Sequence, residues 1–113
     1  RWLLPAHAHK PELVKLMAEM ARSVGARGQF NQQTAMLARP DSHDDLRRVR
    51  VRPLIACGRE DTGTPLAEHE RMHACVPGSR LEVFEQCGHL STIEQPEAVT
   101  ALLTRWLAET QAA

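Results

Sequence analysis

Two short polar stretches in the second half of the chain place ionisable side chains directly after apolar runs. Gly58-Arg59-Glu60-Asp61 follows the first run, and Cys87-Gly88-His89-Leu90 follows the second. In open α/β sheets, ligands and catalytic groups gather beyond the carboxyl ends of the strands. An imidazole can accept and return a proton near neutral pH, and a carboxylate beside its other ring nitrogen orients it. The spacing therefore predicts a pair in which Asp61 orients the ring and His89 acts as the base.

Each residue of this pair also has a simpler interpretation. Aspartate is common in polar turns such as residues 60–63 because it hydrogen-bonds locally, and His89 could be an ordinary loop histidine. Glu60 is a competing acid one position earlier, although the spacing from Gly58 and towards Pro65 favours Asp61. The order of acid and histidine, each after an apolar run, favours the catalytic interpretation.

The elements that would position these residues form a repeating pattern. Helical spacing of apolar residues predicts helices at 11–24, ended by Gly25, and at about 29–38, followed by one short turn of helix at 44–49. The period then changes, and we expect a strand at 51–58, a helix from Thr64-Pro65 to Cys75, a strand at 80–85 and a last helix from Pro96. Strand, helix, strand, helix predicts an α/β fold with two parallel strands.

Two parallel strands do not form a stable sheet alone, because such strands are normally flanked by neighbours and covered on both faces. The chain also begins with Arg1 rather than Met. We therefore expect a fragment in which residues 1–49 are the end of a helical cap or lid region. Residues 50–113 would be the C-terminal part of a larger core, and the missing N-terminal part of the same chain would be its partner.

The two motifs resemble those of the α/β-hydrolase superfamily. The stretch from Pro53 to Asp61, followed by Thr64-Pro65, is similar to the acid-bearing strand and loop of that family, and Cys87 to Glu97 resembles its histidine loop. Enol-lactonases and small carboxylesterases are the most similar members. The resemblance covers residues 50–108 well, and residues 1–49 resemble the end of a cap more weakly.

This resemblance implies the fold class of an α/β-hydrolase C-terminal fragment, with catalytic residues Asp61 and His89. It also implies a small-molecule ester or lactone substrate, an acyl-enzyme, and neither cofactor nor metal. The family order is serine, acid, histidine, and no serine here fits Gly-x-Ser-x-Gly. The nucleophile and the oxyanion hole are therefore expected upstream of Arg1, and the fragment alone is expected to be inactive.

Two other functions remain open. The same fold can serve as a binding module without catalysis, since fold does not fix function. Alternatively, His69-Glu70-Arg71-Met72-His73 matches the zinc-peptidase pattern H-E-x-x-H, in which both histidines share one helix face. The short helix, and the lack of a third ligand at the expected spacing, weigh against zinc.

Composition narrows the range of partners. Lys plus Arg and Asp plus Glu number 14 each, so no basic field attracts nucleic acid. No apolar run approaches the length of about 20 residues that spans a bilayer. Cys57, Cys75 and Cys87 lack metal-binding spacing and are expected to be small buried thiols in a reducing compartment. We therefore predict no nucleic-acid partner, no membrane association and a cytoplasmic location.

Overall fold

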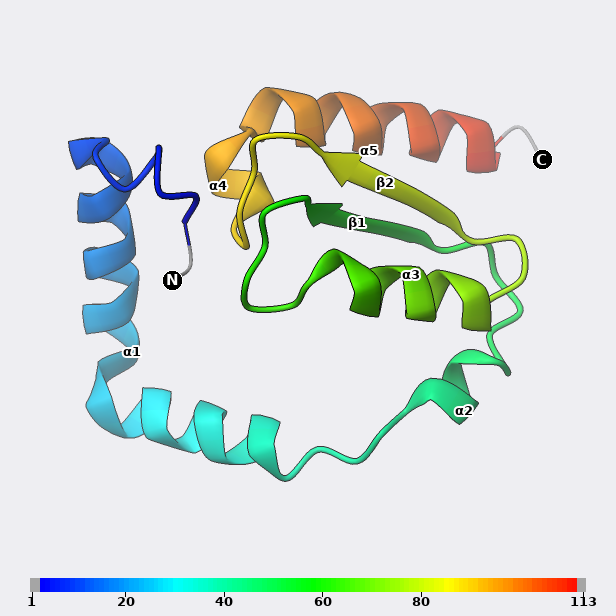
Figure 1. The fold of residues 1–113 in the computed structure, drawn as a ribbon, viewed down its shortest axis with the longest axis horizontal. Coiled ribbons are helices and arrows are strands. Elements are labelled where there is room, and N and C mark those ends of the chain that lie inside the picture. Colours follow the sequence, from blue (N-terminus) through cyan, green and yellow to red (C-terminus); the bar gives the residue numbers. More distant parts are fainter. Residues whose placement is uncertain (1–2, 112–113) are drawn as a thin grey trace.

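The structure is a computed structural model that describes residues 3–111 (Figure 1). Its elements in chain order are α1 (Pro11–Leu37), α2 (His43–Leu46), β1 (Leu54–Gly58), α3 (Leu66–Cys75), β2 (Arg80–Phe84), α4 (Ser91–Glu94) and α5 (Pro96–Gln111). Within this described part, no helix is both long and apolar enough to cross a membrane.

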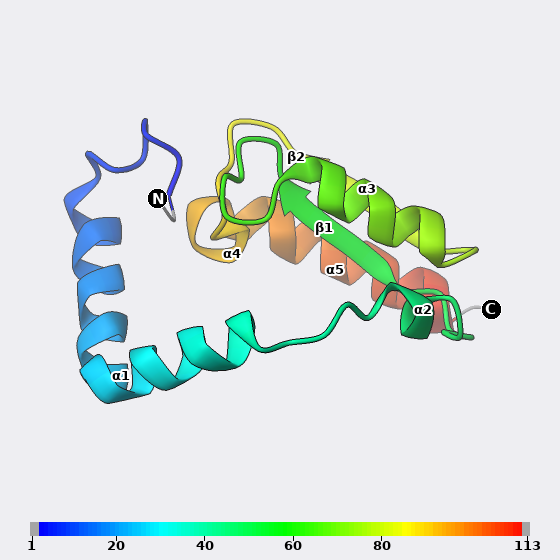
Figure 2. The same cartoon turned by 60° about the horizontal axis from the view of Figure 1, so that its bottom comes forward.

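The two strands form a parallel pair, as the sequence predicts. Leu54 lies opposite Arg80 and Gly58 opposite Phe84, so both strands end at the same edge. Helix α3 connects them and lies on one side of the pair, while α5 lies on the other (Figures 1 and 2). The loops that follow β1 and β2 therefore meet at one edge, which is the arrangement that brings Asp61 towards His89.

The core of the described chain is small and lies between β2 and α5. Phe84, Cys87 and Leu102 form a buried cluster, against which Leu54 and Val99 pack. Val76, at the end of α3, is also buried. The other apolar side of α5 is less covered, since Leu103 and Leu107 remain exposed. One face of α5 thus packs against Cys87 of the histidine loop.

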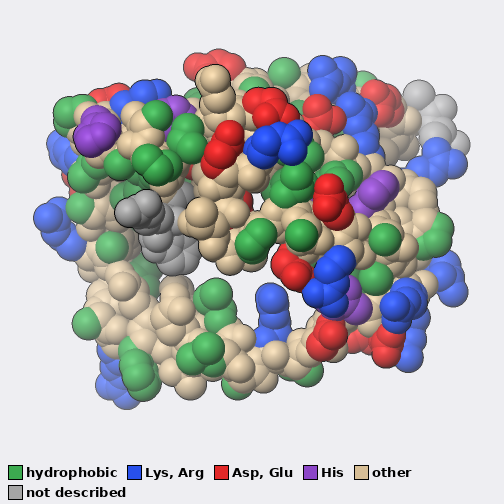
Figure 3. All heavy atoms as spheres, in the orientation of Figure 1, with side chains coloured by type: hydrophobic (Ala, Val, Ile, Leu, Met, Phe, Trp, Pro, Cys, Tyr) green, Lys and Arg blue, Asp and Glu red, His purple; other side chains and the backbone are tan. Residues whose placement is uncertain are grey.

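Helix α1 consists of two helical arms that meet at a sharp kink. Gly25 has φ 69° and ψ 165°, which is left-handed backbone that favours glycine. The first arm ends there as predicted, but the second arm starts directly after it rather than near residue 29. The arms form an L around one side of the strand pair (Figures 1 and 2). Apolar side chains lie exposed along both arms (Figure 3), including Phe30 at 70% and Leu37 at 89%.

The short elements can be compared with the sequence-based prediction one by one. β1 begins at Leu54 rather than at residue 51, because the pairing of Leu54 with Arg80 is the first and Pro53 has no N–H to donate. The short turn of helix predicted at 44–49 is present as α2, which begins one residue earlier and ends at Leu46. Helix α4 was not predicted, and its four residues complete the histidine loop.

Candidate active site

Asp61 lies in the loop after β1, and its carboxylate is held by this loop. Oδ1 accepts hydrogen bonds from the backbone N–H groups of Gly63 at 2.7 Å and Thr64 at 2.9 Å. Oδ2 accepts a bond from Oγ1 of Thr64 at 2.8 Å. The side chain is 4% exposed. These hydrogen bonds fix the orientation of the carboxylate and therefore of its oxygen Oδ2.

The same loop keeps Asp61 ionised. Burial by itself raises the pKa of the carboxyl, but hydrogen bonds from Thr64, His89 and Gly63 outweigh burial and lower the pKa from 3.8 to about 2. A carboxylate that accepts several hydrogen bonds is stabilised in its charged form. Asp61 therefore carries a negative charge throughout the neutral range.

His89 lies in the loop after β2 and faces Asp61. Its Nδ1 is 2.9 Å from Oδ2 of Asp61, and its side chain is 26% exposed. The structure thus brings together the two residues that the sequence singled out, although they are 28 positions apart. A carboxylate fixed beside one ring nitrogen can hold the tautomer in which the other nitrogen accepts a proton.

Gly58 allows the two loops to approach each other. A Cβ atom at this position would lie 2.2 Å from the carbonyl oxygens of both Cys87 and Gly88. The backbone N–H of Glu60 also donates to the carbonyl of Cys87 at 3.0 Å. The last residue of β1 is therefore in direct backbone contact with the loop that carries His89.

We expect the substitution Gly58→Ala to displace the histidine loop. Overpacking of this kind costs about 1 to 3 kcal/mol, and here the clashing atoms belong to the backbone and cannot rotate away. The free energy of unfolding of the full-length protein, measured in urea, should fall by about 2 to 3 kcal/mol. Gly28→Ala makes the same chemical change in α1, where the added Cβ would meet a side-chain atom of Val24 rather than backbone, and serves as control. Equal stability of both variants would contradict this contact.

Glu60, the competing acid one position before Asp61, contacts the backbone of the histidine loop. Its Oε2 accepts a hydrogen bond from the backbone N–H of Cys87 at 2.9 Å, whereas Asp61 contacts the imidazole. Sequence reasoning had not assigned Thr64 a part in the site. The spacing Asp-x-x-Thr is a local signal for it, because Asp side chains often accept bonds from backbone two or three residues on.

The three cysteines form no disulfide. Cys57 and Cys87 are buried as predicted, whereas Cys75 is half-buried. Burial, together with the nearby Glu94, Glu60 and Asp61 carboxylates, raises the pKa of Cys87 to about 11. A thiol with a raised pKa is a poor nucleophile, so Cys87 serves the core rather than chemistry.

The H-E-x-x-H histidines make unrelated contacts. Nδ1 of His69 lies 3.3 Å from the carbonyl oxygen of Pro65, and Nδ1 of His73 lies 2.7 Å from Oγ of Ser79. Among residues 3–111, no three His, Cys, Asp or Glu side chains are placed to hold a metal ion. The geometry offers no third ligand to this pair within the described chain.

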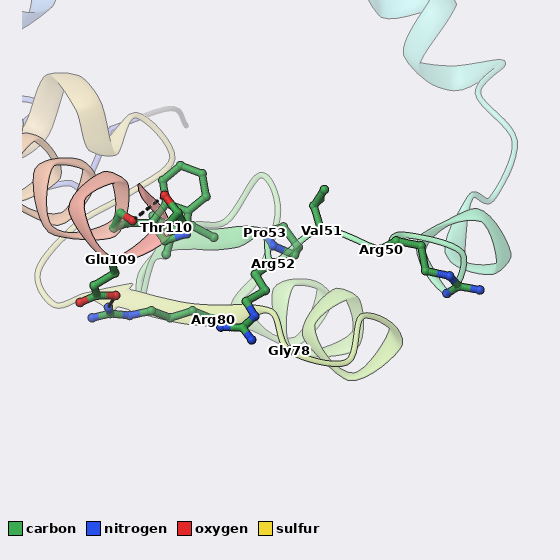
Figure 4. Close-up of a pocket in the computed structure, with 10 residues that line it drawn as sticks. Arg50, Val51, Arg52, Pro53, Gly78, Arg80, Glu109 and Thr110 are labelled. Carbon is green, nitrogen blue, oxygen red and sulfur yellow. Dashed lines mark hydrogen bonds and ion pairs between the residues drawn. The ribbon is translucent and has the colours of Figure 1, made fainter. Parts of the chain in front are cut away.

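Two of the hollows in the described chain differ in their distance from the histidine loop. One of about 320 Å³ is bounded by Met17, Met20 and Val24 of α1, by three glutamines of its second arm, and by Leu90. It adjoins the histidine loop, since Leu90 follows His89. A wider hollow of about 810 Å³ lies at the amino ends of the strands, where Arg80 pairs with Glu109 at 3.2 Å (Figure 4). The wider hollow is remote from Asp61 and His89, so the smaller one is the better candidate for a ligand.

Comparisons with known proteins agree with this arrangement. The sequence profile of the alpha/beta hydrolase family matches residues 1–102. A 2-hydroxymuconate semialdehyde hydrolase of Pseudomonas putida is 31% identical over 99% of this chain, which covers 44% of that protein. The structure of a thermophilic esterase from Thermogutta terrifontis superposes with a TM-score of 0.88 at 31% identity, over 96% of this chain and 40% of the esterase.

An enol-lactonase from Burkholderia xenovorans shares the fold, with a TM-score of 0.81 at 18% identity, over 96% of this chain and 41% of the lactonase. The chain belongs to the alpha/beta hydrolase family. The α/β-hydrolase fold class predicted from the sequence is confirmed. The two parallel strands and their flanking helices correspond to part of the α/β-hydrolase fold. The chain spans less than half the length of each of these three proteins.

Proposed function

We propose that this chain is the C-terminal portion of a serine hydrolase that cleaves a carboxylic ester or lactone through an acyl-enzyme. His89 is its general base and acid, and Asp61 orients His89. The observation that carries the proposal is the 2.9 Å contact between Nδ1 of His89 and Oδ2 of Asp61, at the edge where both strands end. The esterase and hydrolase relatives add support.

The reaction follows from these two side chains and a serine supplied by another part of the protein. Nε2 of His89 takes the serine proton as the serine oxygen attacks the ester carbonyl, and Asp61 stabilises the imidazolium. The proton then passes to the leaving alkoxide as the C–O bond breaks. Water attacks the acyl-enzyme in the same way, again with His89 as base, and releases the acid and the serine. No cofactor or metal takes part.

Residues 1–49 would form the end of the lid over the acyl group of the substrate. The hollow beside Leu90 supports this role, because its α1 wall presents Met17, Met20 and Val24 next to the histidine loop. Apolar walls with a few amide groups suit an uncharged acyl chain. We assign residues 50–113 to the C-terminal part of the hydrolase core.

The nucleophile and the oxyanion hole belong, in this proposal, to a part of the same protein upstream of Arg1, and the chain alone is inactive. Among residues 3–111, β1 and β2 pair only with each other, and Leu103 and Leu107 of α5 are exposed. Further strands and helices of the core would cover these surfaces. The three unpaired thiols fit a reducing compartment such as the cytoplasm.

The proposal can be tested on the full-length protein with p-nitrophenyl acetate and a fluorophosphonate probe. We expect ester turnover, labelling of one serine that mass spectrometry places outside residues 1–113, and no effect of a chelator. Absence of both turnover and labelling would favour a binding module instead. Turnover that a chelator abolishes would favour the metallopeptidase.

A further inference from the structure

Glu94 is a buried carboxylate that has no part in the reaction proposed above. It ends α4, five residues after His89, and its side chain is 0% exposed. Burial of a carboxylate costs free energy unless hydrogen bonds replace its water. The donors that meet this need therefore indicate what Glu94 holds in place.

The two oxygens of Glu94 contact two different parts of the chain. Oε1 accepts hydrogen bonds from the backbone N–H groups of Gly88 at 3.1 Å and Leu90 at 3.3 Å, the residues on either side of His89. Oε2 accepts one from the N–H of Leu4 at 2.9 Å and lies 2.8 Å from Nδ1 of His7. A single side chain thus joins the histidine loop to the segment before α1, which runs beside α4 (Figures 1 and 2).

The histidine loop is held closely on this side. Residues 85–90 belong to no helix or strand, so side chains and neighbouring loops hold their backbone. A Cβ at Gly88 would lie 2.6 Å from the N atom of Leu4 and 2.9 Å from Oε1 of Glu94. The N–H of Cys87 is bound by Glu60, as described above. Two carboxylates therefore fix the backbone on both sides of His89.

We infer that Glu94 is a positioning residue that sets His89 against Asp61 and couples the segment before α1 to the histidine loop. The expected effect of Glu94 on turnover rests on the proposed function. Its expected effect on the position of His89 does not. Small displacements of a catalytic group can cost about 100-fold in rate. His7 leads into α1, and the first arm of α1 borders the hollow beside Leu90. The contact between His7 and Glu94 therefore acts on substrate binding rather than on His89 as the base.

The test compares Glu94→Gln with Glu109→Gln in the full-length protein. Glu109 is exposed and pairs with Arg80 at the amino ends of the strands, so its substitution makes the same chemical change away from the site. Glu94→Gln should lower kcat per fluorophosphonate-titrated site by about 10- to 100-fold. It should also shift or abolish the low-field proton signal of His89 Nδ1–H, which is identified by its loss in His89→Ala. Glu109→Gln should change neither.

A second pair of variants, both at His7, tests the contact made by Oε2 of Glu94. The result supports or overturns the inference even if Glu94→Gln does not fold. His7→Ala should raise KM severalfold with kcat per titrated site unchanged, and His7→Gln, whose amide can donate, should restore KM. Unchanged kcat and proton signal in Glu94→Gln, or unchanged KM in His7→Ala, would overturn the inference. If the wild-type protein hydrolyses no ester, the proposed function fails, and the His89 proton signal alone decides the role of Glu94.

Discussion

Replacing His89 with alanine in the full-length protein should lower kcat for p-nitrophenyl acetate by on the order of 10⁴- to 10⁶-fold, with little change in KM. The imidazole of His89 faces the fixed carboxylate of Asp61 at the carboxyl edge of the strands. In the proposed mechanism, loss of this ring leaves the serine proton without an acceptor during attack and the leaving group without a donor. Substrate binding depends on other side chains and should persist.

The matched controls for this experiment are His73→Ala and His69→Ala. Both histidines lie on α3, where their rings contact Ser79 and Pro65 rather than Asp61. Under the serine mechanism both variants should keep the wild-type kcat. Under the zinc alternative the order reverses, since the α3 variants would lose activity together with any bound metal while His89→Ala remained active. Turnover of His89→Ala at the wild-type rate would remove His89 from the reaction.

Much of the site could be predicted because its signals are local. An apolar run followed by Gly and a polar turn places Asp61 after one strand, and a second such run places His89 after the next. The parallel pairing of these strands then brings the two loops to one edge. The Asp61–His89 contact therefore depends on features that each occupy only a few neighbouring residues.

Features that depend on distant contacts were not predicted. The bonds of Glu94 to Leu4 and His7 join residues about 90 positions apart, and nothing near Glu94 in the sequence indicates them. The close approach permitted by Gly58 likewise depends on the carbonyl of Cys87 in another loop. The position of Gly25 predicted where the first arm of α1 ends. It did not predict that the second arm would start directly afterwards, because a left-handed glycine fits both a helix end and a kink.

The substitution Asp61→Asn should lower kcat of the full-length protein by about 10³- to 10⁴-fold, with little change in KM. The amide that replaces the carboxylate can present its N–H₂ group to Nδ1 of His89, which favours the tautomer with the proton on Nε2. That tautomer cannot accept the serine proton. Asp45→Asn makes the same chemical change on α2, where the exposed carboxylate pairs with Arg48, and should leave kcat unchanged.

The same pair of variants should differ in the pH dependence of stability. The pKa of Asp61 is lowered to about 2 in the folded protein, so the ionised carboxylate stabilises the fold above about pH 4. A lowering of this size corresponds to about 2 kcal/mol, which is lost progressively as the pH falls towards 2. In urea unfolding, Asp61→Asn should therefore be less stable than wild type at pH 7, and the difference should shrink below pH 4. A difference that stayed constant down to pH 2.5 would mean that the carboxylate is not held in its charged form, and Asp61 would then be a poor partner for an imidazolium.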